Sequence, residues 1–293
     1  MIRIGVDLGG TKIEAAGLDT DGRTLFRERI ATPQNYKQGL EAIIGLIRKA
    51  ESMLGPAIGV GIGHPGSFSP ETGVLRGANS TWLNGRDFQR DLTEAFGRPI
   101  RFANDADCFA LSEAVDGAGM GHSKIFGVIL GTGVGGGIII DGEPYSGAQN
   151  IAGEWGHNSL PWMRADEFPG PVCWCGQVGC IETWLSGPGV ARDFNDRTGE
   201  SMQAIEILQR PGELARYTRR LAKALSTVIN ILDPDVIVLG GGVSNAPGLA
   251  DATQDALQGH VFSDVIRTRI LRHAHGDSSG VRGAAMLWPS SPS

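Results

Sequence analysis

The stretch IRIGVDLGGTKIEAAGL, residues 2–18, decides the fold expected of this chain. Residues 2–8 have the apolar run of a buried strand, and residues 13–18 have that of its neighbour after the turn GGTK at 9–12. This turn nearly matches a P-loop, but it has Thr-Lys where a P-loop has Lys-Ser or Lys-Thr, and a strand rather than a helix follows it. The sequence therefore predicts a β-hairpin whose glycines let backbone N–H groups approach a phosphate.

Two further glycine clusters follow strand-like runs. GTGVGGG at 131–137 follows the apolar run 124–130, and GGG at 240–242 follows the run 235–239. Five glycines within seven residues are costly in backbone entropy, which disfavours a purely structural role. Three such turns predict a nucleotide site, although a hairpin without a ligand is the alternative for any one of them. The predicted nucleotide-binding residues are Gly9, Gly10, Thr11, Lys12, Gly131, Thr132, Gly133, Gly135, Gly136, Gly137, Gly240, Gly241 and Gly242.

Asp7 ends the first strand, directly before the first glycine turn. A carboxylate there would hold Mg²⁺ through water, because Mg²⁺ prefers oxygen ligands and keeps several of its waters. Thr11 adds a hydroxyl and Lys12 adds a positive charge to the same turn. Asp7 is therefore counted with the nucleotide-binding residues.

A short internal repeat suggests two similar halves. The segment GVDLG at 5–9 is matched by GVILG at 127–131, and each runs from a strand into a glycine turn. Five residues alone leave duplication open, but two α/β lobes that each offer a glycine turn to one cleft would explain the match. We expect an N-terminal lobe over 1–118 and a C-terminal lobe over 119–278, with a last helix within 279–293 that returns to the first lobe.

The remaining elements follow from apolar spacing and turn residues. The helix over 36–54 has the clearest periodicity and ends before Gly55-Pro56, a helix stop. The stretch 148–187 is expected to be irregular. Further helices are expected over 87–97, 106–116, 188–197, 201–209, 213–232, 248–258 and 279–288, and further strands over 24–30, 57–62, 100–103, 137–140 and 266–271.

Composition places the chain among globular proteins. Its 293 residues allow a sizeable core, and 26 basic against 32 acidic residues without a basic cluster disfavour nucleic-acid binding. No apolar run approaches the ~18 residues of a membrane span, and the first residues lack a signal-peptide pattern. We therefore expect a soluble, cytoplasmic protein that binds neither nucleic acid nor membrane. Cysteines of such proteins more often bind metal or react than form disulfides.

Three of the four cysteines fall within the segment CWCGQVGC at 173–180. Together with His157 upstream, Cys173, Cys175 and Cys180 give the ligand count of a tetrahedral structural Zn²⁺ site. Reduced buried thiols are an alternative, and a disulfide is disfavoured because Cys173 and Cys175 flank a single residue. Four protein ligands leave no open position for catalysis, so the expected zinc is structural.

Five polar residues are candidates for chemistry on a sugar. Asp105 follows a short strand at a helix start and would be a general base beside Asn104, although capping of the helix is the plain alternative. Glu154 and Glu182 bracket the expected zinc loop, where two carboxylates would bind neighbouring hydroxyls; solvated surface carboxylates are the alternative. Asn79 is either a turn residue or a sugar contact.

Together these segments resemble the ROK family of bacterial sugar kinases, within the actin/Hsp70/hexokinase-like superfamily. DLGGTK (7–12) and GTGVGGG (131–137) resemble the family's two phosphate motifs, and AND (103–105) resembles its catalytic segment. GEWGH (153–157) and CWCGQVGCIE (173–182) resemble its sugar and zinc segments. The resemblance covers essentially the whole chain. It implies an α/β protein with the two-lobed actin-like ATPase (ribonuclease H-like) fold and an inserted zinc-binding loop.

The resemblance also implies residue roles and partners. Asp105 would be the general base. The implied cofactors are ATP, Mg²⁺ and a structural Zn²⁺ on a loop over 153–182, and a homodimer is expected because dimers are common in the family. The implied sugar contacts are Asn79, Asn104, Asp105, Glu154, His157 and Glu182, of which His157 would also ligate zinc.

Within the family, three segments most resemble bacterial fructokinases that also accept mannose: NSTWLNG (79–85), AGEWGHNSLPWM (152–163) and HGDSSGVRGAA (275–285). One departure is His64, where many members have Ile before Pro-Gly. We therefore expect ATP-dependent phosphorylation of the 6-hydroxyl of D-fructose, with mannose as a second candidate substrate. N-acetylglucosamine kinase and glucokinase of the same family are alternatives, because pocket shape distinguishes these sugars.

Two other classes of protein are alternatives. A non-catalytic sugar-sensing regulator of the same family would carry an N-terminal DNA-binding extension, and the first phosphate strand here begins at residue 2, which leaves no room for one. A filament-forming ATPase of the actin type would need neither the cysteine cluster nor the sugar-like carboxylates. Both alternatives are therefore disfavoured.

Overall fold

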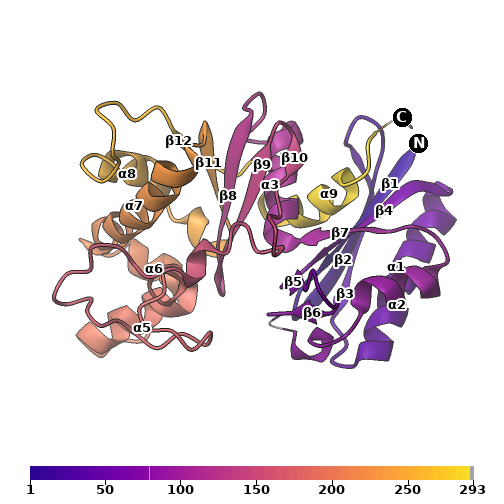
Figure 1. Ribbon diagram of the computed structural model, residues 1–293, viewed down its shortest axis with the longest axis horizontal. Coiled ribbons are helices and arrows are strands. Elements are labelled where there is room, and N and C mark those ends of the chain that lie inside the picture. Colours follow the sequence, from indigo (N-terminus) through magenta and orange to yellow (C-terminus); the bar gives the residue numbers. More distant parts are fainter. Residues whose placement is uncertain (79, 291–293) are drawn as a thin grey trace.

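The computed structural model describes residues 1–78 and 80–290, so Asn79 lies outside the described residues. Two five-stranded sheets form two halves that lie side by side in Figure 1. The first sheet has the order β3 (Thr24–Ala31), β2 (Lys12–Leu18), β1 (Ile2–Leu8), β4 (Ala57–His64) and β7 (Arg101–Asn104). The second has the order β10 (Glu143–Pro144), β9 (Val134–Ile140), β8 (Lys124–Leu130), β11 (Val236–Gly240) and β12 (Arg269–Arg272).

The two sheets have the same topology. β1 pairs antiparallel with β2 and parallel with β4, and β8 likewise pairs antiparallel with β9 and parallel with β11. The glycine turns that follow β1 and β8 therefore lie at equivalent places in the two halves. This repeated strand order confirms the expected two-lobed α/β architecture, whereas the lobe boundary at residue 118 stays a prediction.

Helices surround both sheets (Figure 1). The helices are α1 (Tyr36–Leu54), α2 (Phe88–Phe96), α3 (Asp105–Asp116), α4 (Glu182–Leu185), α5 (Gly187–Thr198), α6 (Ala204–Leu208), α7 (Glu213–Leu232), α8 (Leu249–Ala256) and α9 (Ser279–Met286). The 3₁₀ helices are η1 (Thr81–Leu83), η2 (Trp155–His157), η3 (Gly242–Asn245) and η4 (Gly276–Ser278), and a small hairpin pairs β5 (Ser67–Phe68) with β6 (Leu75–Arg76). No helix within the described residues is both long and apolar enough to cross a bilayer.

Helix α1 shows how local sequence produces the predicted elements. The Asn35 side chain caps its first turn by accepting the N–H of Gln38. Ile43 and Ile47 lie on one face and are fully buried in the core of the first half. The helix ends at Gly55, whose positive φ of 89° suits glycine. Its bounds agree with the helix predicted over 36–54.

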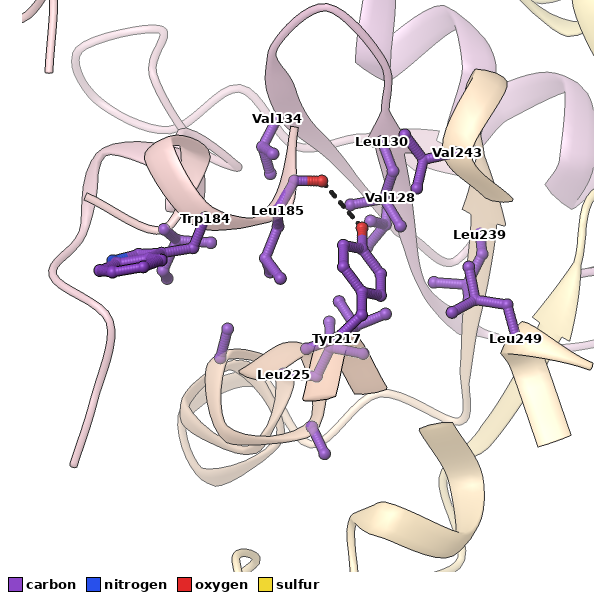
Figure 2. Packing of buried hydrophobic residues seen from close by; sticks show 14 of the residues in the cluster. Val128, Leu130, Val134, Trp184, Leu185, Tyr217, Leu225, Leu239, Val243 and Leu249 are labelled. Atoms are coloured by element: carbon purple, nitrogen blue, oxygen red, sulfur yellow. Dashed lines mark hydrogen bonds between the residues drawn. The ribbon is translucent and has the colours of Figure 1, made fainter. Parts of the chain in front are cut away.

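The core of the second half holds the segment that carries Glu182. Tyr217 of α7 is 3% exposed, and its hydroxyl donates to the carbonyl of Leu185 at 2.8 Å (Figure 2). This hydrogen bond satisfies a buried polar group. Val128 and Leu239 bring β8 and β11 into the same apolar cluster. Helix α4, which begins at Glu182, is thus fixed against the second sheet.

Helices α3 and α9 each pack on the sheet of the other half. α9, near the end of the chain, lies on β1 and β4, where Gly5 and Gly61 leave room for its backbone. α3 follows the first sheet in the sequence but packs mainly on β8 and β9, where Gly127 leaves room for Ala110. The two helices also pack on each other, between the sheets (Figure 1).

The structure differs from the predicted elements in several places; for example, β12 begins at Arg269 rather than at 266, and α6 begins at Ala204 rather than at 201. β9 begins at Val134 rather than at 137, because Val134 pairs with Leu130 directly across the glycine turn. Helix α4 lies within 148–187, a stretch predicted to be irregular. Its four residues are too few to display helical spacing, so tertiary packing rather than local pattern determines it.

Candidate active site

A cavity of about 690 Å³ lies between the two halves. Its walls come from the β4–β5 loop, the N-terminus of α3, the start of β9, η2 and the cysteine-rich loop. The volume is typical of small-molecule sites. Five of the six predicted sugar contacts line the cavity: Asn104, Asp105, Glu154, His157 and Glu182. The sixth, Asn79, lies outside the described residues.

Asp105 is the first residue of α3, directly after β7. Asn104 is the N-cap, and its Oδ1 accepts the N–H of Ala106 at 2.8 Å; Asp105 Oδ1 accepts the same N–H at 2.8 Å. Burial raises the pKa of Asp105 to about 6, while the hydrogen bond from Ala106 opposes this shift and the charge of Glu154 adds to it. A carboxyl with this pKa is largely ionised at neutral pH and basic enough to accept a proton.

Asn104 joins two walls of the cavity. Its Nδ2 donates to the carbonyl of Gly66 at 2.9 Å, while its Oδ1 caps α3. The capping alternative weighed for Asn104 and Asp105 therefore holds for Asn104, and Asp105 lies within the first helical turn. The β4–β5 loop is thereby fixed beside Asp105.

Two glutamates approach the cavity from either side of the cysteine-rich loop. Burial raises the pKa of Glu154, with His157 opposing the shift and the charge of Glu182 adding to it. Glu182 Oε2 accepts the N–H of Val134 at 2.9 Å, and Glu182 Oε1 accepts the indole N–H of Trp174 at 2.6 Å. Both oxygens of Glu182 thus have a fixed donor and retain further capacity to accept hydrogen bonds.

The histidine and the three cysteines converge as predicted, with all four ligand atoms within 4.8 Å of one another. Cys173 Sγ lies 3.7 Å from His157 Nδ1, and Cys175 Sγ lies 3.7 Å from Cys180 Sγ. Ligands on a tetrahedral Zn²⁺ with bonds of about 2.3 Å would be separated by roughly this distance. The donor set and its spacing therefore fit zinc, and all four cysteines of the chain are free thiols, which excludes the disulfide alternative.

The first and third glycine turns form at strand ends, as predicted. The N–H of Gly9 donates to the carbonyl of Lys12 at 2.9 Å and closes the β1–β2 hairpin. A Cβ added at Gly241 would lie 2.5 Å from the carbonyl oxygen of Leu130, so the third turn lies beside the second. The N–H of Gly187 also donates to the carbonyl of Gly131 at 2.8 Å. Phosphate binding at these turns stays a prediction.

The last three glycines of the second cluster lie inside β9 rather than in a turn. A Cβ at Gly136 would lie 2.8 Å from the carbonyl oxygen of Gly153, and one at Gly137 would overlap the carbonyl oxygen of Ala106. A Cβ added at Gly135 would lie 3.6 Å from the Cβ of Ala106. The close approach of β9 to α3 thus explains glycine at 137, and the close approach of the chain at Gly153 explains glycine at 136.

Two further buried carboxyls lie near Asp105. Burial raises the pKa of Asp7 to about 7, and the charges of Asp105 and Glu14 add to the shift. Burial also raises the pKa of Asp107 to about 7, again with a contribution from Asp105. A cation close to these carboxylates would relieve their repulsion, so the arrangement around Asp7 fits Mg²⁺ held through water.

Sequence reasoning missed two residues of this region, Asp107 and Arg76, and the donor role of a third, Trp174. Asp107 is 4% exposed, and its Oδ1 has no hydrogen-bond partner among the residues that the structure describes. Arg76 lines the cavity and donates to the carbonyl of Gln149 at 3.0 Å, which links the two halves. Trp174 donates to Glu182, a contact that forms only once the cysteine-rich loop is folded. Of these residues, only Asp107 could have been noticed in the sequence, because it is a second aspartate two positions after Asp105.

Residues 3–291 match the ROK family. The chain belongs to the ROK family. Curated relatives of this ROK protein include the N-acetyl-D-glucosamine kinase of Salmonella gallinarum, which is 39% identical over 296 residues, 97% of this chain and 98% of the relative. The N-acetyl-D-glucosamine kinase of Salmonella typhimurium has the same identity and coverage. The expected family is thus confirmed, whereas these relatives do not support the expected fructokinase subtype.

Solved structures agree with this assignment. The ROK hexokinase from Thermus thermophilus has a TM-score of 0.84 to this ROK protein at 30% identity, over 99% of this chain and 98% of that one. A ROK family glucokinase from Streptomyces griseus, in complex with glucose and AMPPNP, has a TM-score of 0.81 at 26% identity, over 99% and 100% of the two chains. The similarity spans both halves, so the two-lobed fold of the family is confirmed.

Proposed function

We propose that this ROK protein is an ATP-dependent sugar kinase that phosphorylates the 6-hydroxyl of N-acetyl-D-glucosamine. N-acetyl-D-glucosamine replaces fructose as the first choice because the curated relatives that match 97% of the chain are kinases of that sugar. The structural observation that carries the proposal is the position of Asp105, a buried carboxyl with a raised pKa, in the cavity that also holds Glu154 and Glu182.

The proposed reaction is an in-line phosphoryl transfer. Asp105, ionised at neutral pH, accepts the proton of the sugar 6-hydroxyl while the sugar oxygen attacks the γ-phosphorus of ATP. The bond between the γ-phosphorus and the β,γ-bridging oxygen breaks, and ADP leaves. Asn104, Glu154, His157 and Glu182 would bind the other sugar hydroxyls, and Asn79 remains a predicted contact. Closure of the two halves would exclude water.

ATP would lie along the strand-end turns. The hairpin turn over 9–12 and the neighbouring turns at 131–133 and 240–242 would offer backbone N–H groups to its phosphates. Asp7 would hold Mg²⁺ through water, and when bound this ion would offset the charge of the phosphates. Gly135, Gly136 and Gly137 lie inside β9, and a role of these three glycines in phosphate binding stays a prediction.

His157, Cys173, Cys175 and Cys180 would hold a structural Zn²⁺. Because all four ligands come from the protein, the ion would take no part in the reaction. Its binding would contribute on the order of 10 kcal/mol to ordering the loop over 153–182. The proposal also includes two lobes, over 1–118 and 119–278, with the last helix, within 279–293, packed on the first lobe. It further includes a homodimer.

An ADP-release assay over a panel of hexoses tests the proposed function. We expect the highest kcat/KM with N-acetyl-D-glucosamine, followed by glucose, mannose and fructose. A preference for fructose would restore the expectation drawn from the sequence, and a preference for glucose would make the protein a glucokinase. Calorimetric binding of N-acetyl-D-glucosamine without turnover of any sugar would instead favour a non-catalytic sugar sensor.

A further inference from the structure

Glu182 and the residue that follows Asp105 both contact the chain at the start of β9. Gly133, just before β9, lies against Glu182, since its Cβ would be 2.6 Å from Glu182 Oε2. Gly135 lies against Ala106, the residue after Asp105. Two residues of a strand span about 7 Å, which is comparable with the length of one hexose and its substituents. Asp105 and Glu182 both line the cavity, and the proposed function places a single sugar between them.

Glu154 lines the same cavity as Asp105 and Glu182. A sugar that offers its 6-hydroxyl to Asp105 can therefore present the opposite side of its ring to the other two carboxylates.

The chemistry of a pyranose fixes what that opposite side is. Carbon 5 carries the 6-hydroxymethyl group, and carbon 2 is the ring atom directly opposite carbon 5. If the 6-hydroxyl meets Asp105, as the proposed function requires, the substituent on carbon 2 points toward Glu182. This is the position that carries an acetamido group in N-acetyl-D-glucosamine and a hydroxyl in glucose.

Trp174 stands at this end of the cavity. It lies between Cys173 and Cys175, lines the cavity, and is 64% exposed. Its indole N–H donates to Glu182 Oε1 at 2.6 Å, and its ring meets the ring of His157 edge-on, with centroids 4.9 Å apart. We propose that Trp174 positions Glu182 and forms the wall that receives the substituent on carbon 2 of the sugar.

The proposal follows from the donors that each oxygen of Glu182 has. The backbone N–H of Val134 holds Oε2, so Trp174 supplies the only side-chain donor that the described residues give this carboxylate. With both oxygens oriented, Glu182 can accept a hydrogen bond from an amide or hydroxyl on carbon 2. An acetyl methyl group would pack on the exposed indole ring, whose apolar face is otherwise hydrated. Trp174 would therefore act on sugar affinity and selectivity, not on the transfer step.

The test compares Trp174→Phe with the wild type on two sugars. Phe keeps an aromatic ring and removes the N–H donor. We expect KM for N-acetyl-D-glucosamine to rise roughly tenfold, the value of one hydrogen bond to a charged group, with kcat unchanged. 2-Deoxyglucose has no substituent on carbon 2, so its KM should change by less than about twofold. Equal losses on both sugars, a loss confined to kcat, or no loss would overturn the proposal.

Trp162→Phe is the matched control. Trp162 is 58% exposed, lies in the same irregular segment and stacks on His260 rather than lining the cavity. Its substitution should leave both KM values unchanged, and all variants should keep the zinc content of the wild type. A double-mutant cycle adds Glu182→Gln: if Trp174 acts through Glu182, Trp174→Phe should weaken N-acetyl-D-glucosamine binding much less in that background. Additive losses would show that Trp174 does not act through Glu182.

Calorimetric binding separates this inference from the proposed function on which it rests. If the wild type binds N-acetyl-D-glucosamine but does not phosphorylate it, the kinase proposal fails, and the Kd values of wild type and Trp174→Phe still decide the role of Trp174. If the wild type phosphorylates N-acetyl-D-glucosamine and Trp174→Phe behaves identically on both sugars, only the inference about Trp174 fails. A wild type that binds neither sugar overturns both.

Discussion

Gly283 of α9 lies directly against the main-chain carbonyl of Cys108 in α3, with no room for a methyl group between them. The two helices that cross over to the opposite sheets meet at this point. A side chain at 283 would have to push backbone against backbone, which neither helix can absorb by rotating a side chain.

We therefore expect Gly283→Ala to destabilise the protein, on the order of 1–3 kcal/mol for overpacking. Differential scanning calorimetry would measure the lowered Tm. Gly45→Ala is the matched control, because Gly45 lies within α1 and a Cβ there meets nothing within 4 Å. Alanine at 45 should be neutral or stabilising. Similar Tm values for wild type and Gly283→Ala would contradict the close packing of α3 on α9.

Asp105→Asn should remove most of kcat, by on the order of 10²–10⁴-fold, because the amide cannot accept the hydroxyl proton. Sugar binding should persist, since Asn has nearly the shape of Asp and the helix cap comes from Asn104. Steady-state kinetics with calorimetric Kd values would separate the two effects. Near-normal turnover by Asp105→Asn would rule out Asp105 as the general base.

The pH dependence of the wild type should show the same group. The pKa of Asp105 is raised to about 6 and that of Asp7 to about 7. Lowering the pH protonates both carboxyls, which removes the base and weakens the site expected for Mg²⁺. Activity should therefore fall as the pH drops from about 7 to 5 and reach a plateau above. A profile of kcat/KM that is flat over this range would contradict the assignment of Asp105.

Asp107 gives a stability prediction that does not depend on catalysis. Its pKa in the folded protein is raised to about 7, mainly by burial. The unfolded value is about 3.9, so its favourable contribution is fully present below about pH 4 and is lost as the pH rises through 7. Asp107→Asn cannot ionise and should have a higher Tm than the wild type at pH 8. The gain should disappear near pH 4, and an equal gain at both pH values would contradict this account.

Zinc content tests the cysteine cluster. Elemental analysis should find about one Zn²⁺ per chain. Cys175→Ser should lower both the zinc content and the Tm, whereas Cys108→Ala should keep the zinc because Cys108 is not part of the cluster. Well under one zinc per wild-type chain would count against the site. Chelation should also raise KM for the sugar, since Trp174 and Glu182 border the cluster.

The sequence predicted best what short segments encode. The hairpin of β1 and β2, helix α1 and the cluster of His157 with three cysteines all formed as expected, because turn residues, apolar periodicity and close ligand spacing are local signals. The sequence alone does not separate packing from phosphate binding at the glycines 136 and 137, since a glycine needed for packing and one needed for a ligand look alike in a sequence.

What the sequence did not predict depends on contacts between distant residues. No local pattern in the sequence indicates the hydrogen bond from Trp174 to Glu182 or that from Arg76 to Gln149. The same holds for the packing of α3 and α9 on the sheets of the opposite halves. Sugar specificity belongs with these features, because it depends on which side chains meet in the cavity. The motifs identified the family, but the resemblance of three segments to fructokinases finds no support in the curated relatives, which are N-acetyl-D-glucosamine kinases.

The position of α9 on β1 and β4 has a consequence for synthesis of the chain. A ribosome releases the first sheet long before it reaches residues 279–286, so β1 and β4 emerge without the helix that covers them. The first half therefore cannot finish folding as an independent unit while translation continues. Premature termination anywhere before residue 279 would leave the apolar face of that sheet exposed to chaperones and proteases, however complete the second half had become.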